Sequence, residues 1–160
     1  MSGGPPPTSA SIACVNYELF MGEALEEAKL ALTRGERAVA AVAVVDEAMV
    51  VRAHDRVQAT NDPTAHAVVV ALRETARKLG SVRLADATIF STQEPCPMCV
   101  GALLASDVEA LVYACANQRE GAAGSVVQLA QHPGLARRIK VVSGIRRDEA
   151  EALFAPTAAR

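Results

Sequence analysis

Two cysteines, Cys96 and Cys99, stand three positions apart within residues 94–99, and this pair constrains the chain more than any other feature. The proline after Cys96 favours the first turn of a helix, where the positive end of the helix dipole lowers the pKa of a thiol. The thiolate is the form that binds zinc. One imidazole, that of His66, lies upstream and completes a set of three ligands. Three protein ligands and an open position for water define a catalytic zinc site, which the sequence therefore predicts.

A closed structural zinc site is the alternative interpretation of the same residues. Such a site needs a fourth Cys or His ligand. Cys14 and Cys115 are the remaining cysteines, and neither has a partner at metal-ligand spacing. The open site is therefore favoured.

The composition favours a small substrate over a polymer. The 160 residues suit one domain, and a hydrophobic content of 51% is enough for a packed core. The formal net charge is -2 and the aromatic content is 3%, so the chain lacks the basic and stacking side chains of a typical nucleic-acid-binding protein. No apolar run reaches the roughly 18 residues of a membrane span, and four cysteines are too few for a disulfide scaffold. We therefore expect a cytoplasmic protein without membrane contact.

Turn residues and hydrophobic periodicity predict one domain over residues 16–155, with tails at 1–15 and 156–160. Asp62 is expected to cap a helix that starts at Pro63 and ends at Gly80, which places His66 in the opening turn. Alternating strands and helices predict an α/β fold, a three-layer α/β/α sandwich. The other expected helices begin near Tyr17 or span Pro97–Ser106, Ser125–Ala130 and Asp148–Phe154, and the expected strands span Ala38–Val45, Met49–Ala53, Ala87–Thr92, Ala110–Cys115 and Ile139–Val142.

The chain resembles the cytidine deaminase superfamily, in the branch of tRNA adenosine deaminases and guanine deaminases. Residues 61–66 and 94–99 carry the resemblance, and residues 121–125 and 132–134 are similar to the C-terminal half of the tRNA deaminases. It extends from about Tyr17 to Phe154. The resemblance implies a five-stranded mixed sheet flanked by helices, a zinc-bound water and a homodimer.

Val68 departs from the pattern of this family. The resemblance implies a Glu two residues after the zinc-binding His, which carries protons between the water, the ring and the leaving amine, and valine has no proton to transfer. General acid–base catalysis contributes about 10²- to 10⁴-fold in rate, so we expect an inactive or severely impaired enzyme. Three explanations for Val68 remain open. It is an engineered substitution, or it belongs to a natural paralogue that binds without turnover, or another residue replaces the missing base. Among Asp55, Asp62 and Glu94, Asp55 is the best candidate for that base, and Glu94 is expected to orient the ligands.

The resemblance also aligns Asp55 with a base-contacting Asn of the family. A carboxylate there would favour rings that present an amino group or a ring N–H, and the alternative is a solvated loop residue. The loop after the fourth strand and the C-terminal end lack the Asp and the basic, aromatic residues of tRNA deaminases, so tRNA is an unlikely partner. The resemblance further places these residues at the substrate: Ala41, Asn61, Ala67, Pro95 and Asn117.

Zinc-dependent hydrolytic deamination of a free nucleobase or base analogue is therefore the leading hypothesis. Guanine, isocytosine, cytosine and aminotriazines are the expected substrate types. A tRNA wobble-adenosine deaminase and a non-catalytic base-binding paralogue are the alternatives.

Overall fold

The computed structural model describes residues 15–155. The tails expected at 1–15 and 156–160 therefore lie outside the described residues, apart from Val15. The elements follow one another as α1 (Tyr17–Thr33), β1 (Ala40–Val45), β2 (Ala48–His54), α2 (Val57–Thr60), α3 (Ala67–Leu79), β3 (Ala87–Gln93), α4 (Pro97–Ala105), β4 (Ala110–Cys115), β5 (Lys140–Ser143) and α5 (Arg147–Phe154).

The five strands form one mixed sheet in the order β2-β1-β3-β4-β5. β1 pairs antiparallel with β2 and β3, whereas β3, β4 and β5 run parallel to one another. Parallel strands need crossover connections, and the chain between β3 and β4 supplies one as α4. The expected five-stranded α/β fold is confirmed.

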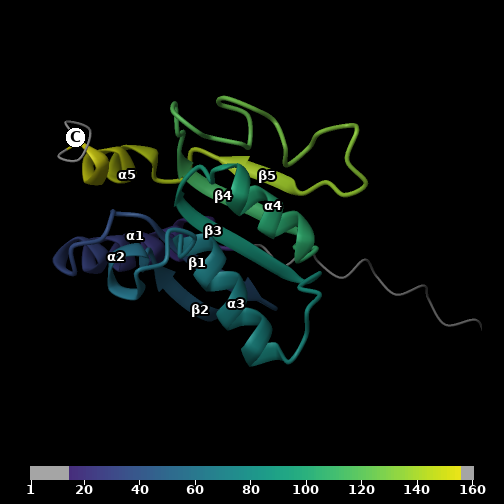
Figure 1. Ribbon diagram of the computed structural model, residues 1–160, viewed down its shortest axis with the longest axis horizontal. Coiled ribbons are helices and arrows are strands. Elements are labelled where there is room, and N and C mark those ends of the chain that lie inside the picture. The colour runs from purple at the N-terminus through teal and green to yellow at the C-terminus, as the bar shows by residue number, and fades with distance from the viewer. Residues whose placement is uncertain (1–14, 156–160) are drawn as a thin grey trace, which may run out of the picture.

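Helices cover both faces of this sheet, with α3 and α4 in front and α1 behind in Figure 1. Side chains alternate across a strand, so Ala41 and Ala43 of β1 pack in the core cluster that contains α3 and α4. Val42 and Val44 point the other way, into a cluster with α1 and α5. The two apolar faces explain why β1 is almost entirely hydrophobic.

The start of α3 differs from the prediction. The Oδ1 atom of Asp62 accepts hydrogen bonds from the Thr64 amide at 2.8 Å and the Thr64 hydroxyl at 2.7 Å, which closes a turn. Such local bonds compete with helix formation. The helix consequently begins at Ala67, and His66 is its N-cap residue, with φ −68° and ψ 149°. The expected end is confirmed, because Gly80 adopts the left-handed conformation with φ 62°.

The helix expected at Ser125–Ala130 is also absent from the structure. The amides of Val126 and Val127 instead donate to the carbonyl oxygen of Gly121, at 3.0 and 3.2 Å. A short antiparallel bridge joins Ala123 to Gln128. These bonds fold residues 121–130 into a compact loop, so their amides are not available for a helix. The short helix α2 was not predicted, and the sequence pattern offers little to find it because none of its four residues is buried.

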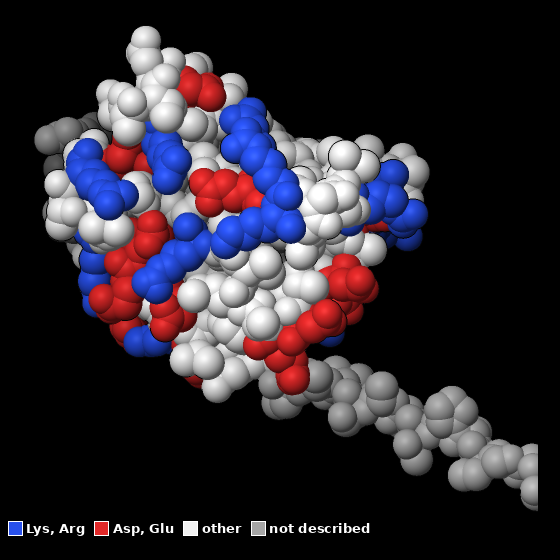
Figure 2. Space-filling view, turned by 90° about the horizontal axis from the view of Figure 1, so that it is seen from below, with Lys and Arg blue, Asp and Glu red and all other residues white. Residues whose placement is uncertain are grey.

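Charged side chains of both signs are mixed on the face shown in Figure 2, which is the lower side of the view in Figure 1. Ion pairs neutralise charges locally in the described part of the chain, including Arg52 with Glu23 at 2.6 Å and Arg73 with Asp62 at 3.9 Å. This face therefore carries no field of a single sign. Within residues 15–155, no helix is long and apolar enough to span a membrane.

Candidate active site

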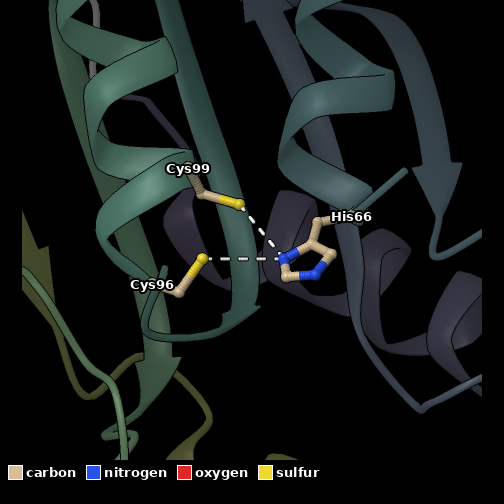
Figure 3. A group of neighbouring side chains, drawn as sticks. All are labelled: His66, Cys96 and Cys99. Atoms are coloured by element: carbon tan, nitrogen blue, oxygen red, sulfur yellow. Dashed lines mark hydrogen bonds between the residues drawn. The ribbon is translucent and has the colours of Figure 1, made fainter. Parts of the chain in front are cut away.

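Three side chains converge between the starts of α3 and α4 (Figure 3). His66 caps α3, Cys96 caps α4, and Cys99 lies in the first turn of α4. Their ligand atoms all lie within 4.8 Å of one another. The prediction that residues thirty positions apart in the sequence form one cluster is therefore confirmed.

The geometry of this cluster fits a zinc ion. The Sγ atoms of Cys96 and Cys99 each lie 3.6 Å from Nδ1 of His66. Zinc bonds of about 2.3 Å to sulfur and about 2.0–2.1 Å to nitrogen, at a tetrahedral angle, separate the two ligand atoms by about 3.6 Å. The donor set is also appropriate, because thiolate sulfur and imidazole nitrogen are preferred zinc ligands.

The two thiols shift each other's pKa in opposite directions. A hydrogen bond from Cys99 lowers the pKa of Cys96 to about 5, and the nearby His66 acts in the same direction. The same hydrogen bond and burial raise the pKa of Cys99. Zinc binds thiolates, so the affinity of this cluster for zinc should fall as the pH is lowered and the thiols are protonated.

Val68 lines the small cavity bounded by the three ligands. Its side chain is only 2% exposed and belongs to the core cluster under α3. The position that the resemblance assigns to a proton carrier thus faces the ligands and presents only methyl groups.

Glu94 lines the same cavity, but its carboxylate is directed into the following loop. It accepts hydrogen bonds from the amides of Asn117 at 3.1 Å, Ala123 at 2.9 Å and Ser125 at 3.0 Å, and from the Ser125 hydroxyl. The side chain is 1% exposed. A buried carboxylate with four donors stabilises the loop beside the zinc ligands. Its expected role in orienting those ligands remains a prediction.

Asp55 is fully buried, which excludes the solvated loop residue considered as its alternative. Its Oδ1 atom accepts from the amide of Ala67 at 2.8 Å, and its Oδ2 atom accepts from Nε of Arg37 at 2.7 Å. Sequence reasoning missed Arg37. The signal was available, because a basic residue before β1 and an acidic residue after β2 become neighbours when the two strands pair antiparallel.

A larger cavity of about 650 Å³ adjoins the small one. Arg37, His66, Asn117 and Glu120 line both cavities, and Asp55 lines only the larger one. Of the other residues expected at the substrate, Ala67 and Pro95 line the small cavity, whereas Ala41 and Asn61 line neither. Ala41 is buried in the core, and Asn61 ends α2 in a left-handed conformation.

Residues 15–115 match the family described as the cytidine and deoxycytidylate deaminase zinc-binding region. The chain belongs to this family of zinc-binding deaminases. Its His/Cys/Cys cluster is the kind of zinc site that is typical of the family.

Individual relatives refine this assignment. The chain is 37% identical over 132 residues to the tRNA-specific adenosine deaminase of Bacillus subtilis (strain 168), covering 82% of each chain. It is 36% identical over 123 residues to the enzyme of the same name from Aquifex aeolicus (strain VF5), covering 77% of this chain and 82% of the relative.

Two solved structures extend the comparison. One, from work on A-to-I editing by tRNA:A34 deaminases, superposes with a TM-score of 0.82 at 33% identity, covering 84% of this chain and 98% of the other. The guanine deaminase from Nitrosomonas europaea superposes with a TM-score of 0.73 at 26% identity, covering 89% and 85%.

Proposed function

We propose that this chain is a zinc-dependent deaminase of the tRNA adenosine type that binds its target adenosine but turns it over slowly. The observation that carries the proposal is the 37% identity to a tRNA-specific adenosine deaminase over 82% of both chains. The sequence alone favours a free-base deaminase, with tRNA adenosine deamination as an alternative. The relatives favour this alternative.

The size of the larger cavity supports a substrate bigger than a free base. A volume of about 650 Å³ falls within the range of about 300–1,000 Å³ that accommodates drug-sized ligands. The target base would lie at the end of the larger cavity that His66 lines, and the rest of that cavity leaves room for its sugar and neighbouring groups. Arg119 lines that larger cavity, where it can meet phosphate oxygens.

Hydrolytic deamination replaces the amino group of the base with an oxygen from water and releases ammonia. His66, Cys96 and Cys99 would hold zinc, which when bound would supply activated water at neutral pH. Protons must also move from that water to the ring and to the leaving amine. Val68 stands where the family resemblance implies a carboxylate for this transfer, and it can exclude water but cannot carry a proton.

The three carboxylates considered as a replacement proton carrier already accept hydrogen bonds from the protein. Asp55 bonds to Arg37 and Ala67, and Asp62 bonds to Thr64. Glu94 accepts four hydrogen bonds from the loop that follows it. A carboxylate whose oxygens already accept hydrogen bonds from the protein is poorly placed to take a proton from water at the zinc ligands. We therefore expect base binding without efficient turnover.

RNA binding tests this proposal directly. Anticodon stem-loops with adenosine at the wobble position should bind the zinc-loaded protein, and affinity should fall with rising salt because phosphate contacts release counterions. Arg119→Gln should weaken binding and reduce the slope of log affinity against log salt by about 1. Arg147→Gln is the matched control, because Arg147 pairs with Glu151 at 2.7 Å and lines neither cavity.

Two outcomes contradict the proposal. Absence of stem-loop binding at low salt would remove the RNA substrate. Binding of free guanine or an aminotriazine by a protein that ignores the stem-loop would restore the free-base hypothesis. The homodimer expected from the family resemblance remains a prediction, which light scattering of the zinc-loaded protein measures.

A further inference from the structure

The ion pair between Arg37 and Asp55 lies beside the candidate zinc site. Its Nε to Oδ2 distance is 2.7 Å, and the two side chains differ sharply in burial: Asp55 is 0% exposed and Arg37 is 50% exposed. The second oxygen of Asp55 accepts from the amide of Ala67 at 2.8 Å. Ala67 directly follows the ligand His66, so one buried carboxylate joins an exposed guanidinium to the backbone of a zinc ligand.

Arg37 and Asp55 form a polar wall beside the zinc ligands, and this wall presents hydrogen-bond donors where the sequence predicted an acceptor. The sequence suggested that Asp55 would offer an acceptor to the substrate. Both of its oxygens, however, already accept hydrogen bonds from the protein. Arg37 lines both cavities, and within residues 15–155 its two terminal guanidinium nitrogens make no hydrogen bond. The substrate therefore meets N–H donors at this wall.

We propose that Arg37, held in place by Asp55, is a specificity-determining residue that donates a hydrogen bond to a ring nitrogen of the target purine. The inference rests on the proposed function and deepens it by naming the group that recognises the base. Guanidinium has donors only and keeps its charge at all working pH values. Adenine offers acceptor nitrogens along its ring, whereas an amino group facing Arg37 would place donor against donor.

Arg37 is suited to this role by its anchoring. A guanidinium fixed through Nε keeps its terminal N–H groups in a defined plane, so less side-chain entropy is lost when they bond to a ligand. Asp55 acts as a positioning residue, since it touches Arg37 and not the small cavity. Lysine would not reproduce the arrangement, because its three donors share one nitrogen on a flexible stem and are not held in a fixed plane.

The test measures coupling between Arg37 and single ring nitrogens. Stem-loops carry adenosine, 1-deaza-, 3-deaza- or 7-deazaadenosine at the target position, each analogue lacking one acceptor. Affinities are measured for the zinc-loaded protein, without reliance on turnover. One analogue should bind the unmodified protein about 10- to 100-fold more weakly than adenosine does, the range expected for a hydrogen bond to a charged group. Arg37→Gln should remove most of that difference for the same analogue only.

Two further variants separate recognition from structural damage. Arg37→Gln with Asp55→Asn removes the buried charge that Arg37→Gln alone leaves unpaired, and it should show the same loss of discrimination with normal zinc content. Asp55→Asn alone keeps an oxygen for the Ala67 amide but frees Arg37, so discrimination should fall only partly. Arg147→Gln should leave all ratios unchanged.

The outcomes are distinguishable. If Arg37→Gln weakens every stem-loop by the same factor, Arg37 contacts the RNA backbone or acts through the fold, and the inference is wrong while the proposed function stands. If it changes no affinity, the inference is equally wrong. If neither the unmodified protein nor any variant binds a stem-loop, the proposed function fails.

Discussion

Nδ1 of His66 lies 3.6 Å from Sγ of Cys96, although the two residues are thirty positions apart in the sequence. The parallel pairing of β3 and β4 around α4 places Cys96 at one helix start, and the turn before α3 places His66 at another. Two helix N-termini thus face one metal site, where their positive ends favour the thiolates that zinc requires.

Removing one ligand should abolish zinc binding. Cys99→Ser or His66→Ala should lower zinc content from about one ion per chain to nearly none, since two protein ligands do not hold zinc tightly. Cys115→Ala is the control, because the Cys115 thiol donates to the Thr92 carbonyl oxygen at 3.4 Å and lies outside the cluster. Metal analysis of the purified variants measures the result. Full zinc content in Cys99→Ser would contradict the ligand assignment.

Gly121 should tolerate no side chain, whereas Gly101 should. A Cβ atom at Gly121 would lie 2.5 Å from both the Glu94 carboxylate and the Asn117 carbonyl oxygen. Gly121→Ala should therefore displace the loop and lower the free energy of unfolding by roughly 1–3 kcal/mol. Gly101→Ala meets nothing within 4 Å on α4 and should stabilise the protein by roughly 0.5–1 kcal/mol.

Denaturant unfolding of both glycine variants measures these effects, and hydrogen exchange at the Ala123 and Ser125 amides locates them. Both amides donate to Glu94. Their protection should fall in Gly121→Ala alone. Equal stability of the two variants would show that Glu94 does not organise this loop.

Stability should decline at alkaline pH partly through Cys115. Burial raises the pKa of this thiol from 9.0 to about 11. Between these values the unfolded chain loses the thiol proton while the folded chain retains it, so the free energy of unfolding falls as pH rises. The contribution is fully present below pH 9 and is lost as the pH rises through about 11; a pKa difference of this size corresponds to at most about 3 kcal/mol.

Urea unfolding from pH 8 to 11 tests this expectation by comparing the unmodified chain with Cys115→Ala. The difference in unfolding free energy between them should shrink across the interval. A difference that stays constant with pH would show that the thiol titrates alike in both states.

The sequence predicted the parts of this molecule that depend on local pattern. The apolar run of β1 and the cysteine spacing at α4 each predict a local structure from a few consecutive residues. The predicted start of α3 was wrong because an Asp at this position can either cap a helix or accept hydrogen bonds within a turn. The amide and hydroxyl of Thr64 both donate to Asp62, which favours the turn.

The missed features depend on contacts between distant segments. The loop at 121–130 follows the hydrogen bonds of buried Glu94, and no helical or strand periodicity encodes them. Arg37 joins Asp55 across eighteen positions because β1 and β2 pair. The zinc ligands could be named from the sequence, whereas the polar wall beside them required the register of the hairpin.

Substitution of Val68 by glutamate tests whether the missing carboxylate limits turnover in this pocket. Conversion of adenosine to inosine in an anticodon stem-loop should rise about 10²- to 10⁴-fold in Val68→Glu, the range of general acid–base catalysis. Val68→Gln introduces a side chain of the size of glutamate that has no titrating proton. This variant should remain as slow as the unmodified chain, with the same zinc content. If Val68→Glu holds zinc and binds the stem-loop yet produces no more inosine than Val68→Gln, this pocket is not an adenosine deaminase site that lacks only its proton carrier.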